Sequence, residues 1–200
     1  TILQTHRFSL SCDGQIFFEG DTIFGYFTGE SLAAQVGLDG GKKAVPWIDE
    51  NASDSSILLD LNSVDYRKVL GEKPEHPHFH LCSGQLSFSD IIRIVPEGGK
   101  FSKGYVYARK EVNPEDWFFP CHFHGDPVMP GSLGVEAIIQ AFQAFALQQG
   151  IGNSFKSPRF LPVLSKVAWK YRGQIIPQNK YMQLDLHVKN IEQQEGQVVL

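Results

Sequence analysis

Apolar and polar residues alternate near the start of the chain, over residues 6–28, which run HRFSLSCDGQIFFEGDTIFGYFT. Alternation with a period of two is typical of a β-strand that buries one face. Asp13 and Gly14 divide the segment, and an Asp-Gly pair between two such runs is the strongest short-range signal for a tight hairpin turn. The pattern therefore predicts two antiparallel strands that meet at Asp13-Gly14.

The same kind of pattern returns in the second half of the chain. Residues 86–112 contain two β-rich runs separated by Gly98 and Gly99, which predicts a second hairpin. Three further apolar-rich runs predict strands over residues 166–176, 181–194 and 196–200. The predicted sheet thus lies mainly after a long helix, which occupies the segment between these two groups of strands.

That helix is predicted from Leu133 onward, because apolar residues there cover most of a helix circumference and need a sheet that wraps around them. Its polar residues form one narrow stripe with helical spacing, made of Ser132, Glu136, Gln140 and Gln143. The simplest interpretation of this stripe is the solvent-exposed edge of a core helix. Glu136 also lies near a helix start, where free backbone N–H groups and the helix dipole can polarise an oxygen atom.

Residues 37–85 have a different character, with Gly-rich, Ser/Asp/Asn-rich and Pro/His-rich stretches around one short predicted helix at residues 63–71. Such a composition is typical of a linker. We therefore divide the chain into residues 1–36, a linker over 37–85 and a folded domain over 86–200. The histidines of its HPHFH run alternate as strand-borne metal ligands could, but a Pro-flanked run without a nearby acid pattern favours a solvated segment; these are His76, His78 and His80.

Composition narrows the functional classes. The chain has 200 residues, 42% of them hydrophobic and 20% charged, which is ordinary for a globular protein. A net charge of −4 gives no electrostatic reason to expect a nucleic-acid partner. Three cysteines without CxxC spacing favour reduced thiols over disulfides or a zinc site. No apolar run is long enough to span a membrane and no signal peptide is recognisable, so we expect a cytoplasmic protein.

Residues 118–137, FFPCHFHGDPVMPGSLGVEA, concentrate polar and conformationally special residues among apolar ones. His122 is a candidate general base, because imidazole exchanges protons near neutral pH. A satisfied core histidine is the alternative interpretation of His122. With His124 and Asp126 it could also bind a metal ion, but we favour turn-forming roles, with Asp126 fixing the loop before Pro127.

Residues 117–140, WFFPCHFHGDPVMPGSLGVEAIIQ, closely resemble the active-site segment of the bacterial 3-hydroxyacyl thioester dehydratase/isomerases of fatty acid synthesis. The likeness covers about residues 86–200, and it implies an α+β hot dog fold, a curved antiparallel sheet wrapped around one long central helix. Tandem domains of this kind also resemble the dehydratase region of polyunsaturated fatty acid synthase multienzymes. This implies that residues 1–36 are the terminal strand pair and tail of a preceding hot dog domain, and that the later domain lacks its last strands.

The resemblance implies a role for each polar group of the segment in the dehydration of a 3-hydroxyacyl thioester. His122 would remove the C2 proton, while the backbone carbonyl of Val128 accepts a hydrogen bond from its other ring nitrogen. The backbone N–H of Gly131 would polarise the thioester carbonyl. Glu136 would protonate the leaving 3-hydroxyl, directly or through water. No cofactor and no metal ion are implied.

Two departures from the family pattern bear on the reaction. The dehydratase/isomerases carry aspartate at the position of Glu136 and cysteine at the position of Ser132, whereas dehydratases that do not isomerise usually have glutamate. Dehydration is therefore implied more directly than double-bond isomerisation. In the family, the histidine and the carboxylate of one active site come from two hot dog units. We therefore expect a second unit as partner, either a homodimer mate or a tandem domain.

Acyl carrier protein with a phosphopantetheine-bound acyl chain is the other expected partner. Basic residues could contact its acidic surface, although they could also be ordinary surface charge; these are Lys156, Arg159, Lys166, Lys170 and Arg172. Aromatic residues could line an acyl tunnel, with core packing as the default interpretation; these are Phe118, Phe119, Phe123, Phe155, Phe160 and Trp169.

Two other functions remain open at the level of sequence. A hot dog thioesterase would use a carboxylate to activate water and would release a free thiol. A non-catalytic dehydratase-like partner would bind acyl carrier protein and support the site of another domain.

Overall fold

The computed structural model forms two compact units, Thr1–Lys42 and Lys43–Leu200, and each is described by itself. The structure describes residues 2–26, 28–30, 45–51, 55–123, 125–162, 168–169 and 173–200.

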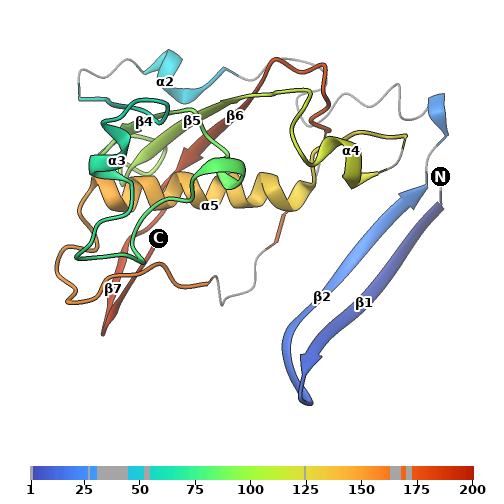
Figure 1. Ribbon diagram of the computed structural model, residues 1–200, viewed down its shortest axis with the longest axis horizontal. Coiled ribbons are helices and arrows are strands. Elements are labelled where there is room, and N and C mark those ends of the chain that lie inside the picture. Colours follow the sequence, from blue (N-terminus) through green and yellow to red (C-terminus); the bar gives the residue numbers. More distant parts are fainter. Residues whose placement is uncertain are drawn as a thin grey trace. The chain divides into compact units, whose positions relative to one another are not determined.

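The first unit contains the predicted hairpin (Figure 1). Strand β1 (Ile2–Cys12) pairs antiparallel with β2 (Gln15–Tyr26), with one irregularity in register after Leu10. Asp13 and Gly14 form the turn with positive φ angles of 51° and 77°. Two consecutive positive φ angles belong to the turn type whose twist matches paired strands, which explains the Asp-Gly sequence. The predicted hairpin is confirmed.

The second unit consists of a sheet, one long helix and several short elements. Four antiparallel strands lie in the order β3-β4-β5-β6, and β7 pairs with β8 in a separate two-stranded sheet. The strands are β3 (Ile57–Asp60), β4 (Ile91–Val95), β5 (Tyr105–Glu111), β6 (Tyr181–His187), β7 (Glu192–Gln194) and β8 (Gln197–Val199). The helices are α2 (Trp47–Glu50), α3 (Tyr66–Val69), the 3-10 helix η1 (Gly84–Leu86), α4 (Phe119–His122) and α5 (Gly131–Gln148).

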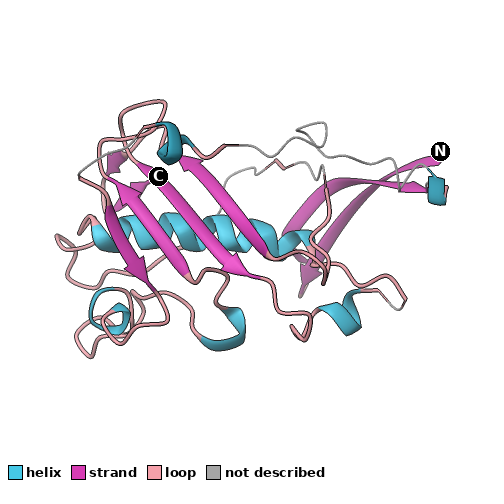
Figure 2. Ribbon diagram, turned by 90° about the horizontal axis from the view of Figure 1, so that it is seen from above, coloured by secondary structure: helices cyan, strands magenta, loops and turns pink. Residues whose placement is uncertain are grey.

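Helix α5 lies along one face of the four-stranded sheet, whereas α2 lies on the other side of the strands (Figures 1 and 2). Alternate residues of β4 and β5 point toward α5, as the period of two requires. Small residues on α5 allow the helix to approach the sheet closely, and large aliphatic residues on the strands fill the remaining space. The fully buried members of this core include Ala141, Ala144, Ile92, Ile94, Val106 and Ala108.

A second apolar cluster joins α4, the start of α5 and the sheet. It consists of Phe88, Phe118, Phe119, Met129, Ala137 and Met182. Phe118 and Phe119 are 3% and 2% exposed, so they pack in the core. Burial of a phenylalanine side chain contributes about 1.5–3 kcal/mol, so this cluster can hold α4 and the loop after it in place.

The structure differs from the predicted linker over residues 37–85. Most of that segment, from residue 43 onward, belongs to the second compact unit, in which β3 pairs with β4 and Leu70 is completely buried against the main core. The unit boundary therefore lies near residue 43. Composition suggested a linker because turn-forming residues surround the short β3 and α3. The apolar side chains of these elements pack against residues distant in the sequence, which local composition does not reveal. The short helix predicted at residues 63–71 is confirmed as α3.

Two strand predictions need correction. Among residues 166–176, those that the structure describes, 168–169 and 173–176, are not in a strand. The predicted strand over 181–194 is divided into β6 and β7, because residues 188–191 leave the ladder between them. Among the described helices, none is long and apolar enough to cross a membrane.

Candidate active site

Helix α4 and the loop after it position His122. The His122 N–H donates to the Phe118 carbonyl at 2.9 Å, which closes the last turn of α4. The loop then bends back, with the Asp126 N–H donating to the Phe123 carbonyl at 3.2 Å, in agreement with the turn predicted there. The side chain of His122 meets the returning loop, and its Nδ1 lies 2.9 Å from the carbonyl oxygen of Val128. This is the hydrogen bond that the family resemblance implies.

The bond to Val128 determines the chemistry of the imidazole ring. A carbonyl oxygen can only accept, so Nδ1 carries the proton and Nε2 of the neutral ring keeps a free lone pair. The ring of His122 is half-buried rather than enclosed in the core, and it stacks at 4.3 Å between ring centroids on the exposed Phe123. His122 therefore has the free Nε2 lone pair and the partial exposure that a candidate general base needs. His124 lies outside the described residues.

The backbone beyond Val128 leads directly into α5. The N–H of Met129 donates to the carbonyl of Ile175 at 2.8 Å, which fixes the loop to a segment distant in the sequence. Pro130, with φ −53° and ψ 129°, is the N-cap and makes no side-chain capping bond. Across the residues that the structure describes, no protein atom accepts a hydrogen bond from the N–H of Gly131. A free donor at the positive end of an 18-residue helix can bind an anionic or polarised oxygen.

The sequence suggested that Glu136 lies in the first turn of the helix. Because α5 begins at Gly131, Glu136 lies in its second turn. Its carboxylate is half-buried, and Oε1 accepts a hydrogen bond of 3.0 Å from Nε2 of Gln140. Ser132, at the position where the family has cysteine, is exposed.

The polar stripe on α5 is not simply the solvent-exposed edge of the helix, because Gln140 is buried. The residue is only 3% exposed, and its side chain bonds to two backbone groups of the segment before β4. Its Oε1 accepts from the N–H of Phe88 at 3.1 Å, and its Nε2 donates to the carbonyl of Leu86 at 2.8 Å. Because Nε2 also donates to Glu136, one buried amide holds the carboxylate in a fixed position relative to the sheet.

Sequence reasoning missed Gln140 as a member of the site. Its spacing of four residues from Glu136 places the two side chains on the same face of a helix, which was the available signal. Its partners at Leu86 and Phe88 are more than fifty residues away in the sequence, and no local pattern reveals them.

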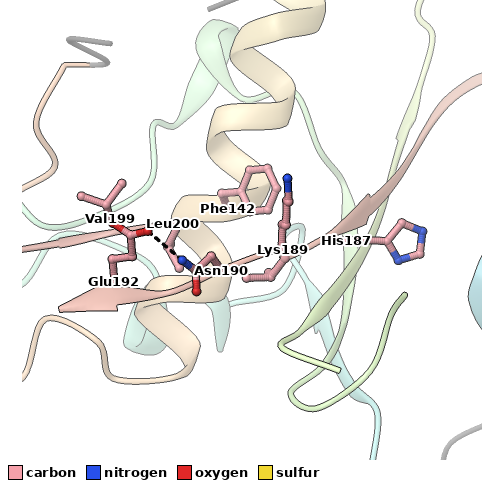
Figure 3. Close-up of a pocket in the computed structure, with 8 residues that line it drawn as sticks. Phe142, His187, Lys189, Asn190, Glu192, Val199 and Leu200 are labelled. Carbon is pink, nitrogen blue, oxygen red and sulfur yellow. Dashed lines mark hydrogen bonds between the residues drawn. The ribbon is translucent and has the colours of Figure 1, made fainter. Parts of the chain in front are cut away.

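Among the cavities bounded by described residues are two that His122, Gly131 and Glu136 do not line. The larger, about 370 Å³, lies beside Phe142 of α5 and residues of the β7–β8 sheet (Figure 3). The smaller, about 10 Å³, lies beside Phe118 and Met129. Within the described part of the chain, no group of three or more His, Cys, Asp or Glu side chains is arranged to hold a metal ion.

Comparison with known proteins shows the family to which this chain belongs. The model of the FabA-like domain family matches residues 81–200. The chain belongs to the FabA-like domain family. The predicted α+β hot dog class is thereby confirmed, with the four-stranded antiparallel sheet and the long helix α5 as its described parts. The match begins close to residue 86, where the resemblance to the dehydratase/isomerases also begins.

A curated relative of this FabA-like chain is a polyunsaturated fatty acid synthase polypeptide of Thraustochytrium sp., which is 39% identical over 204 residues. The match covers 96% of this chain and 13% of the relative, so the chain spans only a small part of the relative's length. Since almost the whole chain is matched, both compact units have counterparts in the relative.

Proposed function

We propose that this chain dehydrates 3-hydroxyacyl thioesters carried by acyl carrier protein, giving 2-enoyl thioesters during the synthesis of fatty acids, including polyunsaturated ones. Membership of the FabA-like family and the name of the relative support the class of reaction. The hydrogen bond between His122 Nδ1 and the Val128 carbonyl is the observation that carries the proposal, because it leaves Nε2 as a free base.

In the proposed reaction, Nε2 of His122 takes the proton from C2 of the substrate. The electron pair of the C2–H bond forms the new C2–C3 double bond, and the hydroxyl group on C3 leaves with a proton as water. The N–H of Gly131 donates to the thioester oxygen, on which negative charge develops. A donor of this kind contributes on the order of 3 kcal/mol to transition-state stabilisation.

Glu136 supplies the proton to the leaving hydroxyl, and Gln140 is its positioning residue. The Gln140 amide occupies one carboxylate oxygen, Oε1, so the other oxygen is available to carry and deliver the proton. Glutamate at this position favours dehydration without isomerisation, because related dehydratases that lack isomerase activity usually carry it.

We further propose that a second hot dog unit completes each site. The support for this proposal is the resemblance to the dehydratase/isomerases, in which the histidine and the carboxylate of one active site come from two hot dog units. Acyl carrier protein would deliver the acyl chain, and the exposed Lys156 and Arg159 are available to contact it. Lys166, Lys170 and Arg172, also expected on that surface, lie outside the described residues.

The test is an assay of the intact protein with a 3-hydroxyacyl thioester, following the absorbance of the enoyl product. We expect His122→Ala and Glu136→Gln each to lower kcat by about 10²–10⁴-fold, the usual contribution of a positioned acid or base. His78→Ala, which changes an exposed histidine of the loop before β4, is the matched control and should keep the parent activity.

The other outcomes separate the remaining functions. Release of free thiol without enoyl product would show a thioesterase. Turnover that survives His122→Ala would show that this unit is a structural partner of another site, and the proposal would then be abandoned. Appearance of a 3-enoyl product would add isomerisation to the reaction.

A further inference from the structure

A second cluster of polar and aromatic side chains lies on the face of the sheet opposite α5. It consists of Trp47 from α2, Tyr105 from β5, and Asp185 and His187 from β6. Oδ1 of Asp185 accepts two hydrogen bonds, from the backbone N–H of Trp47 at 3.2 Å and from the hydroxyl of Tyr105 at 2.5 Å. Asp185 therefore ties α2 to the sheet across 138 residues of sequence.

His187 supports the same contact through its ring. The centroid of its imidazole lies 5.3 Å from that of Tyr105 and 6.4 Å from that of Trp47. The side chain is 10% exposed. Although His187 also borders the 370 Å³ cavity, its ring points away from the other residues that line it (Figure 3). The ring thus belongs to the cluster under α2.

The hydrogen bonds of His187 require its neutral form. Its Nδ1 accepts from the backbone N–H of Lys100 at 3.2 Å, so the ring proton is on Nε2. Nε2 lies 3.8 Å from Oδ2 of Asp185, too far for a hydrogen bond, and has no hydrogen-bond partner among the described residues. An imidazolium ring would place a second proton on Nδ1, directly against the N–H of Lys100.

The turn that contains Gly99 and Lys100 packs on His187 and has little space to adjust. Gly99 has a φ of +80°, and a Cβ atom added there would lie 2.9 Å from both the Gly104 carbonyl oxygen and Nδ1 of His187. The backbone of the turn is therefore packed directly on the imidazole ring. A change in the polarity of Nδ1 must move either the ring or the turn.

We propose that His187 is a proton-controlled latch that holds α2 on the outer face of the sheet. In the neutral state, His187 fixes the turn at Lys100 and leaves Asp185 free to bind Trp47 and Tyr105. Protonation breaks the bond from Lys100 and creates a cation 3.8 Å from Asp185. The carboxylate is drawn toward Nε2–H, and its bonds to α2 and to Tyr105 weaken.

The charged and titratable groups around the ring are consistent with a latch that is closed at neutral pH. Burial lowers the pKa of His187, Asp185 opposes this effect, and Lys100 adds to it. Burial and then the hydrogen bond to Asp185 raise the pKa of Tyr105, so its hydroxyl remains a donor throughout the range. Asp49 of α2 is the remaining charged group that acts on Tyr105.

Helix α2 is a suitable element for such a latch, because among the described residues little besides the cluster holds it in place. The helix has only four residues and no side-chain cap, so it depends on tertiary contacts for its stability. Those contacts are the burial of Ile48 and the interactions of Trp47.

The latch can be tested in the whole chain labelled with 5-fluorotryptophan, with the fluorine resonances assigned by single Trp→Phe substitutions. From about pH 8 to about pH 5, we expect the resonance of Trp47 to shift with a midpoint below 6.5, the ordinary pKa of histidine. The resonance of Trp117, which is remote from the cluster, is the internal control. Titration of the parent's histidine ring carbons should give His187 the same midpoint.

Two variants separate the latch from other titrations. His187→Gln cannot take up a proton, so the transition at Trp47 should disappear. Asp185→Asn removes the carboxylate that attracts the imidazolium, so the midpoint should move down by roughly half a unit to one unit. The latch is refuted if the transition survives His187→Gln, or if His187 titrates in the parent while Trp47 does not respond. It is equally refuted if Trp47 responds only together with a loss of far-ultraviolet circular dichroism.

Discussion

Two histidines of this chain bond to the backbone through the same ring atom but with opposite polarity. Nδ1 of His122 donates to the carbonyl of Val128, whereas Nδ1 of His187 accepts from the N–H of Lys100. The first arrangement leaves a lone pair on Nε2 of a half-buried ring, and the second leaves a buried Nε2–H without a hydrogen-bond partner among the described residues. The backbone partner thus decides whether a neutral ring keeps a free lone pair on Nε2, as in His122, or an N–H, as in His187.

The largest expected difference between the two histidines is in turnover. His122→Gln should lower kcat by about 10²–10⁴-fold, because glutamine cannot remove a proton. His187→Gln should keep turnover within a few-fold of the parent, because its cluster lies on the other face of the sheet. Steady-state assays of both variants with one thioester make the comparison. Equal losses would mean that the contrast between the two rings has no catalytic meaning.

The next largest effect concerns the amide that positions Glu136. Gln140→Leu keeps the approximate volume but leaves the Phe88 N–H and the Leu86 carbonyl buried without their partner. An unsatisfied buried group costs about 1–3 kcal/mol, so the free energy of unfolding should fall by about 2–4 kcal/mol in urea denaturation.

A matched variant on the same helix is Gln143→Leu, which changes a glutamine whose side chain is more exposed than that of Gln140. It should alter the free energy of unfolding by less than about 0.5 kcal/mol. If the two variants were equally stable, Gln140 would not be the structural support of the carboxylate.

A smaller loss of stability is expected from a substitution at Gly99, in the turn that packs on His187. Gly99→Ala places a side chain at φ +80°, against the Gly104 carbonyl and the imidazole, and should lower the free energy of unfolding by about 1–3 kcal/mol. Gly134→Ala is the control within α5, because a Cβ atom there meets nothing within 4 Å. It should raise the free energy of unfolding by about 0.5–1 kcal/mol, and thermal denaturation can compare the two.

The smallest effect is the pH dependence that His187 contributes to stability. Its pKa is lowered in the folded chain, mainly by burial, so the unfolded chain binds more protons below pH 6.5. The contribution is therefore complete above pH 6.5 and is lost as the pH falls toward the folded-state pKa. Urea denaturation at several pH values should show this loss in the parent and not in His187→Gln. An identical pH profile in both proteins would contradict the burial effect.

The local elements of this fold could be predicted from sequence, because their signals lie within a few residues. Asp13-Gly14 has the backbone freedom that a tight turn needs, and apolar residues around α5 indicate a buried helix. The segment with His122 and Gly131 could be recognised for the same reason. Its residues are consecutive, so one stretch contains both the candidate base and the candidate N–H donor.

Other features depended on partners far away in the chain. β3 lies in a stretch with the composition of a linker, and only its pairing with β4 makes it part of the sheet. The position of Gln140 on the helix was predictable, but its role depends on Leu86 and Phe88. A residue's own sequence neighbours do not specify such partners, because a folded core is assembled from segments that are close only in space.

The sequence by itself determined the hairpin, the long helix, the family and the candidate chemistry of residues 118–137. The tertiary structure alone decided the environment of each polar group: which nitrogen of His122 is free, what holds Glu136, and which nitrogen of His187 accepts from the backbone. The physical reason is that hydrogen-bond polarity and burial depend on the atoms that surround a group in the fold. Those atoms are supplied by packing, and the same residue acquires a different chemistry when its neighbours differ.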